Sequence, residues 1–137
     1  MKPFKVCLML LSFLLFAMEL AGCVALLVGG AAGAGSVVYV KGQLKEDMNT
    51  SVLAVHNASI SALKGLNLPI IEDNHDKLSA NIKSKFADGH DVWIEIESVT
   101  AESSKITIRV GILGDEHKSR QILDDIHKHL SGAGGKS

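Results

Sequence analysis

The chain has 137 residues with 14 basic and 15 acidic side chains, and its formal net charge of −1 lacks the basic excess expected of a nucleic-acid-binding protein. Both of its cysteines, Cys7 and Cys23, lie near the N-terminus, so no disulfide is expected in a domain further along the chain. The length suits one domain with one hydrophobic core.

The first 22 residues have the three parts of a secretory signal peptide. Lys2 and Lys5 supply a positive start, and residues 6–17 form an uncharged, mostly apolar run. A helix over this run would span roughly 18 Å, which is short of the ~30 Å hydrocarbon core of a bilayer. We therefore predict a signal peptide over residues 1–22.

The predicted signal peptide and the residue after it contain the pattern Leu20-Ala21-Gly22-Cys23, which resembles a bacterial lipobox. That pattern implies a diacylglycerol on the cysteine sulfur and cleavage immediately before it, so we expect Cys23 to be lipidated and to anchor the chain in a membrane. Val24, rather than aspartate, follows the cysteine, which implies the outer membrane with the domain on its periplasmic face. The alternative is an ordinary signal peptide followed by a chance cysteine.

The segment after the cysteine, residues 23–35, is rich in glycine and alanine. Gly29 and Gly33 have the G-x-x-x-G spacing that lets membrane helices approach closely. An oligomerising membrane helix is therefore one interpretation. Each glycine costs a helix about 1 kcal/mol, and the apolar stretch is short for a span. A flexible tether over 23–35 is our preferred interpretation, and the helix stays as the alternative.

We expect a single domain over residues 36–131 and a flexible tail over residues 132–137. A first strand is predicted over 36–44.

A first helix is predicted to begin at Thr50 or Ser51, either of which can cap it. Its apolar residues recur every three or four positions. Gly65 is placed as its left-handed stop. Pro69 then favours a short edge strand over residues 68–71.

Three alternating segments, at 77–86, 92–97 and 105–112, predict an antiparallel meander with one face toward water. Asp88-Gly89 is a preferred pair for a two-residue type I′ turn between the first two. After Gly114, Asp115 is an N-cap for the last helix, which has apolar residues on one stripe. The order β-α-β-β-β-β-α predicts an α+β two-layer sandwich with both helices on one sheet face.

Several segments resemble a family of small bacterial lipoproteins that is catalogued only as a domain of unknown function. They are the lipobox, the Ala/Gly-rich leader, and the sequences Tyr39-Val40-Lys41-Gly42-Gln43-Leu44, Ile108-Arg109-Val110-Gly111, Gly114-Asp115 and Ser119-Arg120-Gln121-Ile122-Leu123. The resemblance implies an anchor and one domain, and it brings no activity, cofactor or catalytic residue.

No metal site is predicted. His127 and His129 are two apart on a helix and point about 200° from each other, so they cannot share one ion. The remaining histidines are interpreted as solvated: His56 in the first helix, His117 in the last, and His75 and His90 at turns.

No catalytic residue and no cofactor are predicted either. Asp115, His117 and Ser119 are close in sequence, but no G-x-S-x-G elbow is present and the serine falls on a buried stripe. An envelope enzyme is therefore only a distant alternative.

The uncovered face of the sheet is the candidate interaction surface. A tryptophan and an arginine there are residue types enriched among interface anchors. The alternative is a solvated sheet face with lysine–glutamate pairs between neighbouring strands. The residues of this surface are Trp93, Arg109, Lys83, Lys85, Glu95 and Glu97.

These patterns predict a lipid-anchored envelope protein that serves as a binding or structural module. Its partner would be another envelope protein or a cell-wall component, with a second copy of the chain as a further candidate. The alternative is an oligomeric membrane element built on the glycine-rich leader.

Overall fold

Six antiparallel strands and two helices make up the part of the chain that the computed structural model describes, residues 36–133. These residues belong to one compact unit, Gly35–Ser137. The predicted signal peptide, Cys23 and the tether lie outside the described residues. The elements are β1 (Val38–Val40), β2 (Gln43–Met48), α2 (Val52–Gly65), β3 (Ile70–His75), β4 (Ser79–Lys85), β5 (Asp91–Thr100), β6 (Ser103–Val110) and α3 (Glu116–Ala133).

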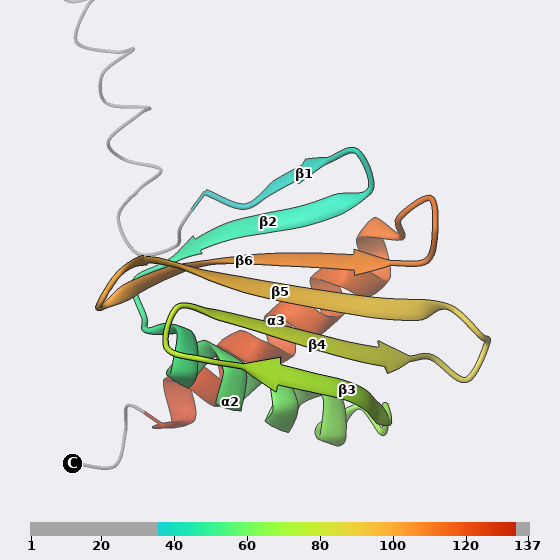
Figure 1. Cartoon of the computed structure of the whole chain (residues 1–137). Coiled ribbons are helices and arrows are strands. Elements are labelled where there is room, and N and C mark those ends of the chain that lie inside the picture. The colour runs from blue at the N-terminus through green and yellow to red at the C-terminus, as the bar shows by residue number, and fades with distance from the viewer. Residues whose placement is uncertain (1–35, 134–137) are drawn as a thin grey trace, which may run out of the picture. The chain divides into compact units, whose positions relative to one another are not determined.

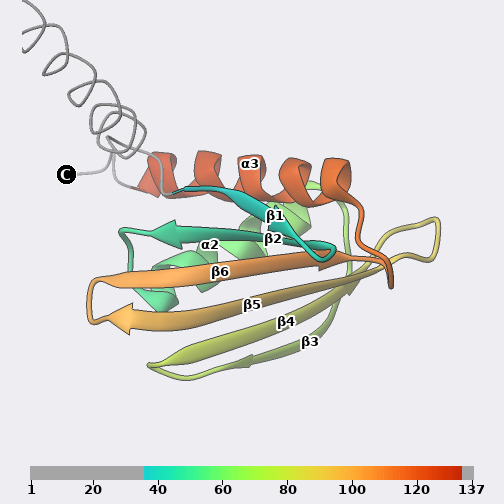
Figure 2. The same ribbon diagram turned by 90° about the horizontal axis from the view of Figure 1, so that it is seen from above.

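The strands follow the order β1-β2-β6-β5-β4-β3 across the sheet, and both helices lie on one face of it (Figure 1; Figure 2). The predicted α+β class is confirmed. In β4, β5 and β6 every second residue packs against the helices, because successive side chains of a strand point to opposite faces. The most buried apolar residues come from both layers: Leu44, Val55, Ala62, Leu63, Ala80, Val92, Ile94, Ile96, Ile106, Ile108, Val110, Ile122 and Ile126.

The expected first strand, 36–44, is divided by a turn into the hairpin β1–β2. Lys41 and Gly42 form the two-residue loop and both have positive φ, at 53° and 77°. That pair of conformations defines a type I′ turn, which matches the twist of the flanking strands. The sequence hides this turn because lysine rarely adopts positive φ.

The β4–β5 connection has a different turn from the one expected. Only Gly89, with φ at 92°, has positive φ, and the Phe86 N–H donates to the His90 carbonyl at 2.9 Å. The Gly89 N–H also donates back to the Phe86 carbonyl at 3.0 Å. The loop therefore has three residues, 87–89, instead of a two-residue type I′ turn.

The helix caps are Ser51, one of the two predicted candidates, and Asp115, as predicted: each side chain accepts a backbone N–H three residues ahead, at 3.4 and 3.0 Å. The predicted stop at Gly65 is wrong. The left-handed residue is Asn67, with φ at 57°, and the Leu68 N–H returns to the Leu63 carbonyl at 2.8 Å, which is the Schellman arrangement.

Two segment ends also differ from expectation. The alternation over 77–86 and 105–112 puts Leu78 and Ile112 on the inward face, but each lies just outside its strand and is exposed. At its other end the domain extends further than expected, because α3 runs to Ala133, into the predicted tail. Among the described residues, no helix is long and apolar enough to cross a membrane.

Candidate functional site

Trp93 lies on the outer face of the sheet, in the register that the alternation predicted. It stands opposite Lys83 on β4 and Arg109 on β6. The Arg109 Cζ is 5.8 Å from the ring centroid, which is a cation–π contact. The indole is half-buried between these neighbours, so one part of a large apolar surface stays open to water.

The other predicted surface residues share this outer face but do not pair as expected. The three-residue turn sets a register in which Lys85 faces Asp91, and the Lys85 Nζ is 3.3 Å from Asp91 Oδ1. Glu95 stands opposite Asn81, and Glu97 opposite Ser79. The expected lysine–glutamate pairs between β4 and β5 are therefore wrong.

Arg109 is held by the loop that follows its own strand. Its Nε donates to the Gly111 carbonyl at 3.3 Å, and its Nη2 donates to the carbonyl of Ile112. Because the same guanidinium also lies over Trp93, it joins the β6–α3 loop to the outer face. Arg109 thus positions this loop, a role that the sequence pattern did not indicate.

The β6–α3 loop also packs backbone to backbone against the β1–β2 turn. A Cβ atom on Gly42 would lie 2.5 Å from the Leu113 carbonyl oxygen, and one on Gly114 would lie 2.3 Å from the Gly42 Cα. Only glycine fits such an approach. We call Gly42 together with Gly111–Gly114 the glycine corner. Two segments that carry the family resemblance, around Gly42 and around Gly111, meet here.

A pocket of about 550 Å³ opens beside the glycine corner, lined by Trp93, His90, Asp91 and the β6–α3 loop. Ile112 and Leu113 project from that loop and are 81% and 92% exposed. Two adjacent aliphatic side chains this exposed, next to an aromatic ring, form an apolar rim. Such a rim is typical of an interaction site rather than of scattered surface residues.

Asp91 gives the pocket a hydrogen-bond acceptor. Its Oδ1 is buried and has no hydrogen-bond partner among the described residues, because the Lys85 contact does not have hydrogen-bond geometry. The Asp91 side chain as a whole is 33% exposed, so a ligand's N–H or O–H group can approach the rest of its carboxylate from the pocket.

The β4–β5 turn, which lines the pocket with Gly89 and His90, is tied to α3. The Asp88 carboxylate accepts from Lys118 Nζ and from the His90 backbone N–H, at 3.1 Å for the latter. These two hydrogen bonds, in that order of importance, hold the pKa of Asp88 well below its usual value of 3.8. The carboxylate is therefore charged at any physiological pH and keeps the turn docked on the helix.

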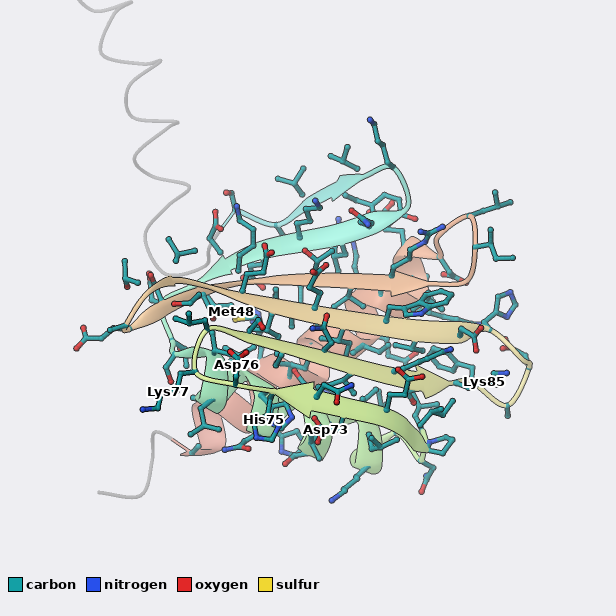
Figure 3. All side chains as sticks on the ribbon, viewed as in Figure 1. Met48, Asp73, His75, Asp76, Lys77 and Lys85 are labelled. Atoms are coloured by element: carbon teal, nitrogen blue, oxygen red, sulfur yellow. The ribbon has the colours of Figure 1, made fainter. Side chains whose placement is uncertain are left out.

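A second polar cluster lies between α2 and β3, and the sequence did not predict it. The His56 Nε2 is 2.6 Å from Asp73 Oδ1, the His75 Nδ1 is 3.5 Å from the same oxygen, and the two imidazole rings are stacked at 4.1 Å. Figure 3 labels Asp73 and His75 on β3, on the side of the strand where α2 lies. Burial raises the pKa of Asp73, but the hydrogen bonds and charges of His56 and then His75 lower it by more.

The interpretation of these histidines as solvated is wrong for His56, which is buried, and His75 is part of a strand rather than a turn. β3 continues to His75 with exposed polar residues that do not alternate with apolar ones, so it gives no strand signal. The one available signal was the paired spacing of Asp73 and His75, which puts both on one face of any strand.

The remaining candidates from the sequence are not assembled into a site. Ser119 Oγ donates to the backbone carbonyl of Asp115 at 2.7 Å, while His117 is exposed, so these three residues form no nucleophile–base relay. His127 Nε2 instead contacts the buried Glu46 carboxylate at 2.7 Å, across the interface between α3 and β2.

Comparison with protein families gives a match over most of the chain. The model of a family described as "Protein of unknown function (DUF3568)" matches residues 5–129. The match includes Cys23, the glycine-rich segment and all the strands. No curated protein matches the chain.

Proposed function

This chain belongs to the family described as Protein of unknown function (DUF3568), and we propose that it is a lipid-anchored module of the cell envelope that binds a protein partner at its glycine corner. Two sets of residues support this proposal. One is the Leu20-Ala21-Gly22-Cys23 pattern at the N-terminus, and the other is the apolar rim and pocket beside Trp93.

The anchor in this proposal is a lipid on Cys23, at the periplasmic face of the outer membrane. Residues 23–35 then form a tether which, at ~3.3–3.6 Å per extended residue, reaches at most about 45 Å from the bilayer. That reach lets the domain meet a partner in the periplasm without leaving the membrane. Replacing Cys23 with serine is expected to release the protein from the membrane fraction. A Cys23→Ser protein that is processed and stays membrane-bound like the parent would refute the lipid anchor.

The observation that carries the binding function is the exposure of Ile112 and Leu113 on a loop that is held in place. Burying one such side chain is worth about 1.5–3 kcal/mol. Exposed loops normally lose conformational freedom on binding, which weakens the complex. Here Arg109 bonds two of the loop's carbonyls and Gly42 packs on its far side, so most of that freedom is already lost in the free protein.

The pocket chemistry favours a segment of another envelope protein. An aliphatic side chain would contact the ring of Trp93 and the rim at Leu113, and a backbone or side-chain N–H would donate to the exposed part of the Asp91 carboxylate. A cell-wall glycan would leave the two aliphatic rim residues in contact with hydroxyl groups. We therefore place a protein ahead of a cell-wall polymer as the partner.

A photo-crosslinking amino acid at position 113, in the full-length protein in cells, tests this proposal. We expect an adduct with one other protein, and we expect Trp93→Ala to abolish it. The matched control places the same crosslinker at position 53 on α2, where Leu53 is 55% exposed, and no such adduct is expected there.

Three outcomes would overturn the proposal. The same adduct from positions 53 and 113 would mean that capture does not depend on the glycine corner. An adduct that survives Trp93→Ala would separate the contact from the pocket. An adduct between two copies of this chain would favour the alternative, an oligomeric membrane element built around Gly29 and Gly33.

A further inference from the structure

Three side chains with metal-binding atoms converge at the open edge between α2 and β3. His56 Nε2, Asp73 Oδ1 and His75 Nδ1 all lie within 4.8 Å of one another. His56 comes from the buried face of α2, while Asp73 and His75 are two residues apart on the inner face of β3. β3 is the last strand of the sheet, so one side of the cluster is open to water (Figure 3).

Both ring nitrogens of His56 have an oxygen atom beside them. Its Nδ1 is 3.4 Å from Asn57 Oδ1, with the amide in the orientation that the structure has, and its Nε2 is 2.6 Å from Asp73 Oδ1. Both neighbouring oxygens are acceptors, and a neutral imidazole has only one N–H to donate. When Nδ1 keeps that hydrogen, the Nε2 lone pair faces a carboxylate oxygen. In that tautomer a metal ion between the two atoms would bind both the lone pair and the carboxylate; in the other tautomer the Nε2–H donates to Asp73 Oδ1.

We propose that His56, Asp73 and His75 bind one divalent transition-metal ion, for which Zn²⁺ is the best match. Two imidazoles and one carboxylate are a donor set that zinc uses, with water in the fourth position. The Nδ1–H of His56 toward Asn57 supplies the outer hydrogen bond that orients a metal-bound imidazole.

The geometry requires a small movement on binding. Tetrahedral ligands at ~2.0–2.1 Å from zinc lie about 3.3 Å from one another, whereas His56 Nε2 and Asp73 Oδ1 are 2.6 Å apart. His56 is fixed by burial, with 5% of its side chain exposed, but Asp73 and His75 are 33% and 44% exposed on an edge strand. The His56–Asp73 pair must open by about 0.7 Å, and the exposed carboxylate and outer imidazole are the groups that can move to form the site.

This site is independent of the proposed binding function. It lies at the β3 edge of the sheet, whereas the glycine corner involves the turn at the β1 edge. An ion here would join α2 to the edge strand, and any ligand that binds only the folded state stabilises it.

The test is a titration of the full-length protein, stripped of metal with a chelator and kept in detergent, with Zn²⁺ and with Co²⁺. We expect one Zn²⁺ per chain by calorimetry, visible Co²⁺ absorption bands of a four-coordinate site, and a rise in unfolding temperature with Zn²⁺. His75→Ala and Asp73→Asn should each weaken Zn²⁺ binding at least tenfold. The matched control is His117→Ala, which removes an exposed histidine of α3 and should bind as the parent does.

Circular dichroism of each variant checks that the fold is kept, and both ligand replacements lie at exposed positions of an edge strand. Absence of Zn²⁺ binding up to about 1 mM would overturn the proposal, as would parent-like affinity in both ligand variants. Binding that persists in His75→Ala but is lost in His129→Ala would place the ion on the C-terminal helix and also overturn it.

Discussion

Alanine at Gly114 should destabilise the domain far more than alanine at Gly89, although both glycines have similar φ angles of 86° and 92°. A Cβ on Gly89 would meet nothing within 4 Å, so Gly89→Ala carries only the left-handed backbone strain, about 1–2 kcal/mol. Gly89→Ala is thus a matched control for the strain alone.

Gly114→Ala adds a collision to that strain. Its Cβ would lie 2.3 Å from the Gly42 Cα and 2.4 Å from the Gly42 carbonyl oxygen. Ordinary contact between carbon atoms begins near 3.5 Å, so the two turns must separate by about 1.2 Å. No rotamer change can relieve this contact, because both partners are backbone. Overpacking of this kind costs about 1–3 kcal/mol, which brings the expected total to about 2–5 kcal/mol.

The assay is urea unfolding of the domain without its N-terminal segment, followed by the fluorescence of Trp93, the only tryptophan of the chain. We expect Gly114→Ala to lower the free energy of unfolding by at least 1 kcal/mol more than Gly89→Ala. In the full-length protein, Gly114→Ala should also abolish the adduct formed from position 113, while Gly89→Ala should keep it. Equal destabilisation by the two variants, within about 0.5 kcal/mol, would refute the close packing of the glycine corner.

Three further predictions follow from the ion pairs and the chain boundaries. NMR should show Asp88 titrating below pH 3.8, and Lys118→Ala should move that midpoint up toward 3.8. Because the pKa is lowered in the folded state, the contact stabilises the fold above pH 3.8, and this stabilisation is lost as the pH falls through the lowered pKa. A midpoint that Lys118→Ala leaves unmoved would contradict this prediction. His127→Ala should lower the free energy of unfolding by about 1–3 kcal/mol, because it leaves the buried Glu46 carboxylate without its partner. Adding Glu46→Met should recover part of that loss, and a further loss in the double variant would contradict this prediction. A fragment that begins at Ser36 should be soluble and unfold in one cooperative transition by circular dichroism, whereas an aggregated product would mean that the leader belongs to the core.

Local patterns were enough to predict the layers and the faces of the sheet. Alternation from Val92 to Ile96 placed Trp93 outward, and the structure agrees, because a shift of one residue would move every apolar side chain of β5 to the wrong face. The caps at Ser51 and Asp115 were also among the residues that local patterns indicated, because a cap depends only on its own helix end.

The candidate sites were beyond such patterns because they depend on contacts between distant residues. Gly42 and Gly114 meet only after β1 and β6 have joined the same sheet, and His56 reaches Asp73 only when α2 packs over β3. The turn at Lys41 was missed since lysine is an unfavourable residue for positive φ. Arg109 was predicted to face a partner, yet its guanidinium bonds its own loop, a contact that alternation cannot report.

Intact mass spectrometry of the protein extracted from membranes is the most direct test of the central claim that this is a lipid-anchored module. We predict a chain that begins at Cys23 and carries the mass of a diacylglycerol, with an additional acyl chain on the new amino terminus. A chain that retains residues 1–22, or one that carries an unmodified Cys23, would contradict the account.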